Sequence, residues 1–171
     1  MTTSPVVRVP KAATTRPTLA VVDPAALESN VALMRRLVAP AQVMVVVKAD
    51  AYGHCAFPIA RAAIRAGAVG VAVALVDEAA DLREQGFDGS ILVLSEPPYE
   101  ALVVAAELGV TSTLYSVRGI AAAQAAARSV GRSMSAHLKI DTGMHRVGAD
   151  LTEAVELAKL IAHARELELV G

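Results

Sequence analysis

The sequence has little cysteine and few aromatic residues, and each shortage excludes a class of function. Its 171 residues include one cysteine, Cys55, which cannot form an internal disulfide or supply a zinc cluster. A lone cysteine is typical of a reducing compartment, so we expect a cytoplasmic protein. There is no tryptophan, and 3% of the residues are aromatic, which leaves few rings on which single-stranded nucleic acid could stack.

An excess of one charge is also absent. There are 16 Lys+Arg against 17 Asp+Glu, a formal net charge of -1, and this near-neutral balance argues against nucleic acid as a partner. No run of about 18 uncharged apolar residues is present to span a membrane, and the N-terminus lacks the apolar core of a signal peptide. Because 54% of the residues are apolar, the sequence predicts one folded domain.

The first 17 residues differ in composition from the rest of the chain. They hold three prolines, five Ser/Thr residues and three basic residues, with no acidic one. This composition predicts a disordered tail over 1–17. An organellar transit peptide is the alternative, although no amphipathic helix is evident there.

From residue 18 onward, β-like runs alternate with helical patterns. Six apolar runs follow one another from Val43, at 43–47, 69–75, 91–94, 110–114, 135–140 and 167–170. Helix starts are indicated by Asp23-Pro24, by Ser116 and by a capping box at Asp150-x-x-Glu153. Strands that alternate with helices predict an α/β fold with a parallel sheet and right-handed crossovers.

Two parallel architectures fit this alternation, an open doubly wound sheet and a TIM-type (β/α)8 barrel. A barrel takes about 250 residues, so this chain would form an incomplete one with about six of the eight βα units. A doubly wound dinucleotide-binding sheet should carry G-x-G-x-x-G after its first strand. The residues after Val47 do not match it, and no Walker loop or H-E-x-x-H is present.

Lys48 follows five consecutive apolar residues and therefore stands at the carboxyl end of the first buried strand. A lysine there can simply extend into water. It can also be chemical, because barrel enzymes carry catalytic groups at this end of their strands and a partly desolvated lysine forms Schiff bases. Its spacing alone leaves both interpretations open.

Two longer segments carry a family resemblance. Residues 47–54 read V-K-A-D-A-Y-G-H and residues 137–148 read H-L-K-I-D-T-G-M-H-R-V-G. Both segments, in this order, resemble motifs of the alanine racemase family, whose cofactor is pyridoxal 5′-phosphate. The resemblance implies a cofactor-binding barrel domain over 18–171 and a cytoplasmic homodimer. It also implies that L-alanine and D-alanine are the substrates and that D-alanine supplies cell-wall peptidoglycan.

The resemblance also implies roles for four residues. Lys48 would bind pyridoxal phosphate covalently and act as the base for one face of the substrate. Tyr52 would donate a hydrogen bond to the cofactor phosphate. Arg146 would lie near the cofactor oxygen and orient the substrate. Lys139 matches a position that is carbamylated in some members, where the modified side chain holds that arginine.

The sequence also departs from the family pattern. In the family, the second base is a tyrosine from a C-terminal β-domain of the partner subunit, and we find no match to that domain. Neither Tyr99 nor Tyr115 matches that tyrosine. The alternatives are therefore a catalytically incomplete cofactor-binding remnant, or a half that needs a complementing chain because its strand edges are open. Small cofactor-homeostasis proteins share the barrel but lack the residues that follow Lys48 here.

Two smaller features allow more than one interpretation. Cys55 replaces the glycine that the family carries after His54, and we expect a small buried thiol there. His137, Asp141 and His145 are spaced four apart, which would align metal ligands on a helix. They fall on a predicted strand and loop instead, so the sequence predicts no metal site.

Overall fold

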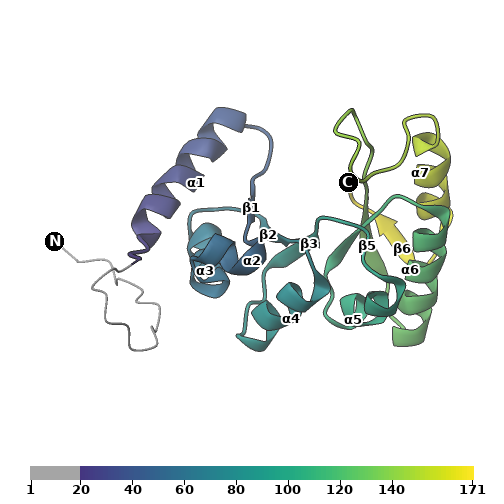
Figure 1. The fold of residues 1–171 in the computed structure, drawn as a ribbon, viewed down its shortest axis with the longest axis horizontal. Helices are drawn as coiled ribbons and strands as arrows, with labels where there is room; N and C mark the ends of the chain where they lie inside the picture. Colours follow the sequence, from purple (N-terminus) through teal and green to yellow (C-terminus); the bar gives the residue numbers. More distant parts are fainter. Residues whose placement is uncertain (1–19) are drawn as a thin grey trace.

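A six-stranded parallel sheet forms the centre of the computed structural model, which describes residues 20–171 (Figure 1). The predicted tail at 1–17 lies outside the described residues. All six runs predicted from Val43 onward are confirmed as strands. The strands are β1 (Met44–Val46), β2 (Gly70–Val73), β3 (Ser90–Val93), β4 (Thr111–Leu114), β5 (Met134–Leu138) and β6 (Leu167–Leu169).

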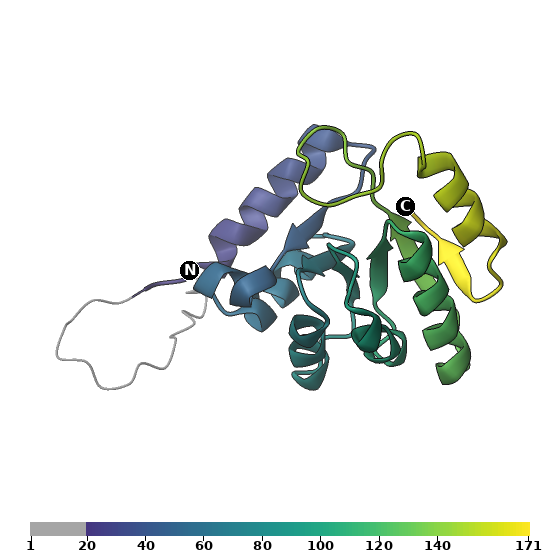
Figure 2. The ribbon, with the colours of Figure 1, turned by 45° about the vertical axis from the view of Figure 1, so that its right-hand side comes forward.

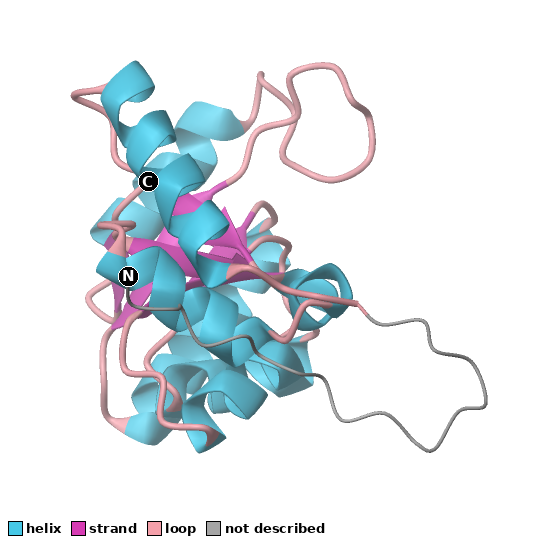
Figure 3. Ribbon diagram, turned by 90° about the vertical axis from the view of Figure 1, so that its left-hand side faces the viewer, coloured by secondary structure: helices cyan, strands magenta, loops and turns pink. Residues whose placement is uncertain are grey.

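The strands lie side by side in the order in which they occur along the chain. Each pairs in parallel with its sequence neighbours, from β1 through to β6. A doubly wound sheet reverses its strand order at a switch point, and no reversal occurs here. Crossovers between consecutive parallel strands are right-handed as a rule, so the connecting helices are expected to share one face of the sheet. Helices surround the central strands in Figure 2 and in Figure 3, where the strands are magenta and the helices cyan. This is the arrangement of a (β/α)8 barrel, and the predicted barrel fold is confirmed.

Capping side chains set where several of the helices begin. The helices are α1 (Pro24–Val38), α2 (Lys48–Gly53), α3 (Ala56–Arg65), α4 (Val76–Glu84), α5 (Leu102–Glu107), α6 (Val117–Val130) and α7 (Ala154–His163), with a 3-10 turn at Tyr99–Ala101. Asp23 Oδ1 accepts from the backbone N–H groups of Ala25 and Ala26, at 2.9 and 3.3 Å. Ser116 Oγ accepts from Gly119 N–H at 2.9 Å. Both predicted caps are therefore confirmed.

The predicted capping box at Asp150-x-x-Glu153 is wrong. Asp150 Oδ1 instead accepts from the N–H and the hydroxyl of Thr152, at 2.8 and 2.7 Å, and α7 begins only at Ala154. A short acidic side chain bonds readily to the backbone two residues on, and that local turn replaces the cap.

Within residues 20–171, no helix is both long enough and apolar enough to cross a bilayer.

The core lies between the sheet and the helices, and its helix side is built largely from alanine. Ala60, Ala79, Ala105 and Ala123 have no exposed surface, and they belong to the same buried cluster as valine, isoleucine and leucine side chains of the strands. Methyl-sized side chains let a helix approach the sheet closely, so a chain with few aromatic residues still fills its interior. The strand side of the cluster includes Val71, Val73, Ile91, Val93 and Leu114.

Arginine side chains tie the loops at the amino ends of the strands. The Arg83 guanidinium donates to three backbone carbonyls, those of Phe87 at 2.6 Å, Gly89 at 2.8 Å and Leu108 at 3.2 Å. Arg132 and Arg35 likewise donate to the carbonyls of Glu107 and Ala66, both at 3.2 Å. The carbonyls of Ala66, Glu107 and Leu108 lie at helix carboxyl ends, which leave carbonyls unpaired, and those of Phe87 and Gly89 lie in the loop before β3.

We expect Arg83→Met to lower the free energy of unfolding by about 2–3 kcal/mol, because three carbonyls lose a charged donor while the apolar stem is retained. Urea unfolding followed by circular dichroism measures it. Arg65→Met is the matched control, since that arginine is 55% exposed and its one ion pair within residues 20–171 is with Glu28, and it should cost less than about 1 kcal/mol. Equal losses in the two variants would contradict this account of Arg83.

Candidate functional site

The carboxyl ends of the strands collect the residues that carry chemistry. Because the sheet is parallel throughout, the loops after β1 to β5 leave from one edge. Lys48 follows β1 after one intervening residue, and Lys139 follows β5 directly. Both lysines are half-buried, and neither forms an ion pair with a residue of 20–171. The structure thus places both predicted lysines at the edge where barrel active sites lie.

The backbone after Lys48 takes a conformation that the sequence did not predict. Ala49, Asp50, Ala51 and Tyr52 all have positive φ, between 51° and 56°, so the segment designated α2 is one left-handed turn. Left-handed helical geometry costs a side-chain-bearing residue roughly 1–2 kcal/mol, and consecutive examples are rare. A strained backbone of this kind must be held by its surroundings, and strain of this kind clusters at functional sites.

Hydrogen bonds from both ends and from the side hold this turn. Ala51 N–H donates to Val47 O at 2.8 Å, and Asp50 Oδ1 accepts from Ala56 N–H at 2.7 Å, where α3 begins. Glu78, in the first turn of α4, accepts from Ala49 N–H at 2.6 Å. The sequence analysis did not single out Glu78. Its one notable feature in the sequence is that it is an acidic residue in the first turn of a predicted helix.

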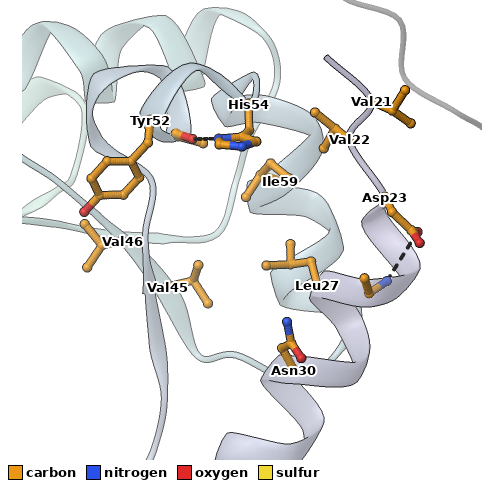
Figure 4. A pocket seen from close by; sticks show the side chains of 12 residues that line it. Val21, Val22, Asp23, Leu27, Asn30, Val45, Val46, Tyr52, His54 and Ile59 are labelled. Carbon is orange, nitrogen blue, oxygen red and sulfur yellow. Dashed lines mark hydrogen bonds between the residues drawn. The ribbon is translucent and has the colours of Figure 1, made fainter. Parts of the chain in front are cut away.

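Tyr52 projects from the turn with 60% of its surface exposed. Figure 4 shows its hydroxyl near Val46 of β1 and directed away from His54, whose Nδ1 lies 2.8 Å from Ala51 O. Tyr52 lines a largely apolar pocket between α1, β1 and α3, and Lys48 is not among the residues of that pocket. The Tyr52 hydroxyl is therefore accessible to a molecule in solution.

Lys139 and Arg146 lie in one loop that begins where β5 ends. Lys139 O accepts from Ala149 N–H at 2.8 Å, and Asp141 N–H donates to Ala149 O at 2.9 Å, which closes the loop at its base. Lys139 Nζ reaches past β4 to Leu94 O, beyond the end of β3, at 3.4 Å. Arg146 is exposed and lines a small pocket together with Lys139. The structure thus brings these two residues together, in a pocket separate from the one that Tyr52 lines.

Asp141 fixes the interior of the same loop. Its Oδ1 accepts from the N–H groups of Gly143 and His145, at 2.9 and 3.1 Å. These bonds, that of Gly143 foremost, lower the pKa of Asp141 below its ordinary value of 3.8. His145 Nδ1 lies 3.6 Å from Asp141 Oδ2, and no group of three or more His, Cys, Asp or Glu residues within 20–171 could hold a metal ion.

Cys55 occupies a position whose backbone conformation favours glycine. Its φ is +69° and its ψ is 100°, a conformation that side chains rarely adopt. The predicted buried thiol is wrong, because Cys55 is only half-buried. The backbone must turn here between the left-handed segment and α3, and that requirement explains why a related motif carries glycine.

The side chains at this edge fit a phosphorylated aldehyde cofactor. Lys48 offers a half-buried primary amine, and Tyr52 offers an exposed phenol four residues later. Three cations, Lys48, Lys139 and Arg146, stand on loops of the same edge and form no ion pair with residues of 20–171. An amine for the carbonyl carbon, a donor for phosphate and cations for its charge are the groups that such a ligand needs.

The family model for the alanine racemase N-terminal domain matches residues 22–171. Alanine racemase 1 of Bacillus subtilis is 44% identical over 143 residues, which cover 82% of this chain and 36% of that protein. The crystal structure of alanine racemase from Bacillus anthracis with bound L-Ala-P superposes with a TM-score of 0.78 at 35% identity, over 88% of this chain and 39% of that one.

A relative with a different named substrate has the same fold. Histidine racemase from Leuconostoc mesenteroides superposes with a TM-score of 0.76 at 27% identity, over 84% of this chain and 39% of that one. The chain spans about two fifths of the length of the curated relatives that it matches.

We expect the loop at 141–149 to stay ordered down to a pH below 3.8 and to loosen as the pH falls through the depressed pKa of Asp141. A carboxylate whose pKa is lower in the folded state than in the unfolded state stabilises the fold at any pH above its unfolded-state pKa. That stabilisation is lost as the pH falls through its folded-state pKa. The amide proton shifts of Gly143 and His145, followed by NMR against pH, measure this transition. Asp141→Asn keeps an acceptor without a titrating group, so the same acid transition in that variant would contradict the assignment.

We expect Cys55→Gly to raise the free energy of unfolding by about 1 kcal/mol, because relief of the positive φ outweighs the added freedom of the unfolded chain. Thermal unfolding measures it. Ala56→Gly is the matched control, since the adjacent residue is helical, and glycine there should lower stability by roughly 0.5–1 kcal/mol. Destabilisation by both substitutions would show that the Cys55 backbone is not strained.

Proposed function

Because the chain belongs to the alanine racemase family, we propose that it is the pyridoxal-phosphate-binding part of an enzyme that interconverts L-alanine and D-alanine. The observation that carries the proposal is the half-buried Lys48 at the carboxyl end of β1, with no ion-pair partner in residues 20–171 and with a strained turn directly after it. A lysine kept in one place without a partner is suited to covalent chemistry at its Nζ.

Each of the four site residues has a role in this proposal. When bound, pyridoxal phosphate supplies an electron sink for the charge left at the substrate α-carbon. Lys48 Nζ holds the cofactor and moves the α-proton on one face of the substrate. The Tyr52 hydroxyl donates to the cofactor phosphate, and the Arg146 guanidinium orients the substrate. The exposure of Tyr52 and Arg146 supports both assignments.

Lys139 supports Arg146 in this scheme. Both side chains line one small pocket. A carbamate on Lys139 Nζ would replace a cation by an anion, and an anion there would pair with the Arg146 guanidinium and fix it. Without that modification, two neighbouring cations would repel one another.

Racemisation also needs an acid–base group on the opposite face of the substrate. Burial raises the pKa of Tyr115 above its ordinary 10.0, and the nearby Glu96 carboxylate raises it further, so this phenol is a poor base at neutral pH. Arg118 stacks on the Tyr99 ring at 4.5 Å from its centroid. Neither tyrosine is assigned the second role, in keeping with the family pattern of a tyrosine supplied by a partner subunit in a homodimer.

A cofactor-binding part that needs a complementing chain is the second candidate. Within residues 20–171, β1 and β6 each pair along one side only, which leaves two open sheet edges. Folded proteins normally pair or cover such edges. In either case we propose that the enzyme makes D-alanine for peptidoglycan in the cytoplasm. We assign the chain no role in binding nucleic acid or membranes.

The test is to incubate the chain with pyridoxal phosphate, reduce it with borohydride and locate the adduct by peptide mass spectrometry. We expect modification of Lys48 and none in Lys48→Ala. Lys159→Ala is the matched control, because that lysine pairs with Glu156 on the surface of α7, and it should be modified at Lys48 like the unaltered chain.

Chiral analysis of alanine from the same samples separates the two candidates. D-alanine formed from L-alanine by the unaltered chain and not by Lys48→Ala would establish racemase activity. An adduct on Lys48 without D-alanine would favour the cofactor-binding part that needs a complementing chain. A folded chain with no selective adduct on Lys48 would overturn both.

A further inference from the structure

The carboxylate of Glu78 joins two loops at the carboxyl edge of the sheet. Its Oε2 accepts from Ala74 N–H at 2.7 Å and from Leu75 N–H at 3.1 Å, in the loop between β2 and α4. Its Oε1 accepts from Ala49 N–H at 2.6 Å, in the turn after β1. One side chain thus takes three backbone donors from two βα units.

Helix capping explains two of these three contacts. An acidic residue in the first turn of a helix is stabilised by the helix dipole and bonds to N–H groups at that helix's own start. The contacts of Oε2 with Ala74 and Leu75 are of that kind. Oε1 lies toward a different unit, 29 residues earlier in the chain, and contributes nothing to capping α4.

The Ala49 N–H belongs to the peptide bond that joins Lys48 to Ala49. Holding that peptide plane restricts the backbone of Lys48 and therefore the direction in which its side chain leaves β1. Ala49 is also the first residue with positive φ in the strained turn, at 51°. A short bond to a carboxylate is among the stronger hydrogen bonds in proteins, and it offsets part of the cost of that conformation.

Glu96 repeats the arrangement one pair of strands further along. Its Oε2 accepts from the N–H groups of Tyr115 and Ser116, at 2.8 and 3.0 Å, and its Oε1 accepts from the Ser116 hydroxyl at 2.7 Å. It therefore joins the loops after β3 and β4 as Glu78 joins those after β1 and β2. Neither loop carries Lys48, so Glu96 serves as an internal control.

We propose that Glu78 is a positioning residue that fixes Lys48 for reaction with the cofactor. This inference rests on the proposed role of Lys48, and it assigns to Glu78 a task separate from stabilising α4. The carboxylate acts through the Ala49 peptide and not through contact with the reacting atoms. Loss of Oε1 as an acceptor frees the Lys48–Ala49 peptide and lets the turn relax.

Two variants and one control test the proposal. Glu78→Gln replaces one of the two carboxylate oxygens by an NH₂ group, so one side-chain atom that now accepts from a backbone N–H becomes a donor. Glu78→Asp keeps the charge at the start of α4 but is one methylene shorter, so it serves if the glutamine variant does not fold. Glu96→Gln makes the same chemical change at the matched position. Each chain is first shown to be folded by circular dichroism.

The first readout is amide hydrogen exchange, which needs no cofactor. In the Glu78 variants we expect the Ala49 amide to exchange about tenfold faster or more, with Tyr115 unchanged. In Glu96→Gln we expect the reverse, faster exchange at Tyr115 with Ala49 unchanged. Unchanged exchange at Ala49 in both Glu78 variants would overturn the proposal.

The second readout is the rate of the borohydride-trapped adduct on Lys48, compared with that on Lys159. We expect it to fall about tenfold or more in the Glu78 variants and to stay within about twofold in Glu96→Gln. Equal loss in all three variants would show a general structural effect and overturn the proposal. No Lys48 adduct in the unaltered chain would instead refute the proposed function, while exchange at Ala49 would still decide whether Glu78 anchors the turn.

Discussion

Parallel pairing of the strands in chain order is the constraint on which the rest of this structure depends. It sends every βα loop to one edge of the sheet, and right-handed crossovers send the helices that connect the strands to one face. Residues far apart in the sequence, such as Lys48 and Lys139, therefore lie at the same edge because of the strand pairing, without a direct contact between them being needed. The same pairing leaves the carboxyl ends of six short strands as a platform whose chemistry is decided by the loops alone.

The charges on the two edges follow from the backbone groups that each edge exposes. Helices begin at the carboxyl edge and leave free backbone N–H groups there. The carboxylates of Asp50, Glu78 and Glu96 accept hydrogen bonds from backbone N–H groups of this edge. Helices end at the opposite edge and leave free carbonyls, to which Arg35 and Arg83 donate. The acids at the carboxyl edge are thus engaged by backbone, so its lysines and arginine remain available to an anionic ligand.

Local patterns in the sequence were enough to predict the strands, the caps at Asp23 and Ser116 and the place of Lys48, because hydrophobic runs and caps depend on neighbours in the chain. The left-handed turn at Ala49–Tyr52 could not be predicted, since no glycine marks it and its support comes from Glu78, 29 residues away. The cap at Asp150 was wrong for a local reason. Its carboxylate accepts from the N–H and the hydroxyl of Thr152, two residues on, and a sequence pattern does not decide between that turn and a helix cap.

The proton chemistry of a racemase shows what this edge of the sheet can supply under the proposed function. Inversion requires a proton to leave one face of the α-carbon and another to arrive on the opposite face, and one side chain cannot serve both. Lys48 and Tyr52 stand on one turn, and Tyr52 is assigned to the phosphate, while the raised pKa of Tyr115 keeps that phenol protonated at neutral pH. Lys48, Tyr52 and Arg146 would therefore account for cofactor attachment, substrate orientation and one face of the α-carbon. Under the proposed function, the acid–base group for the other face would be a residue other than Lys48, Tyr52 or Tyr115.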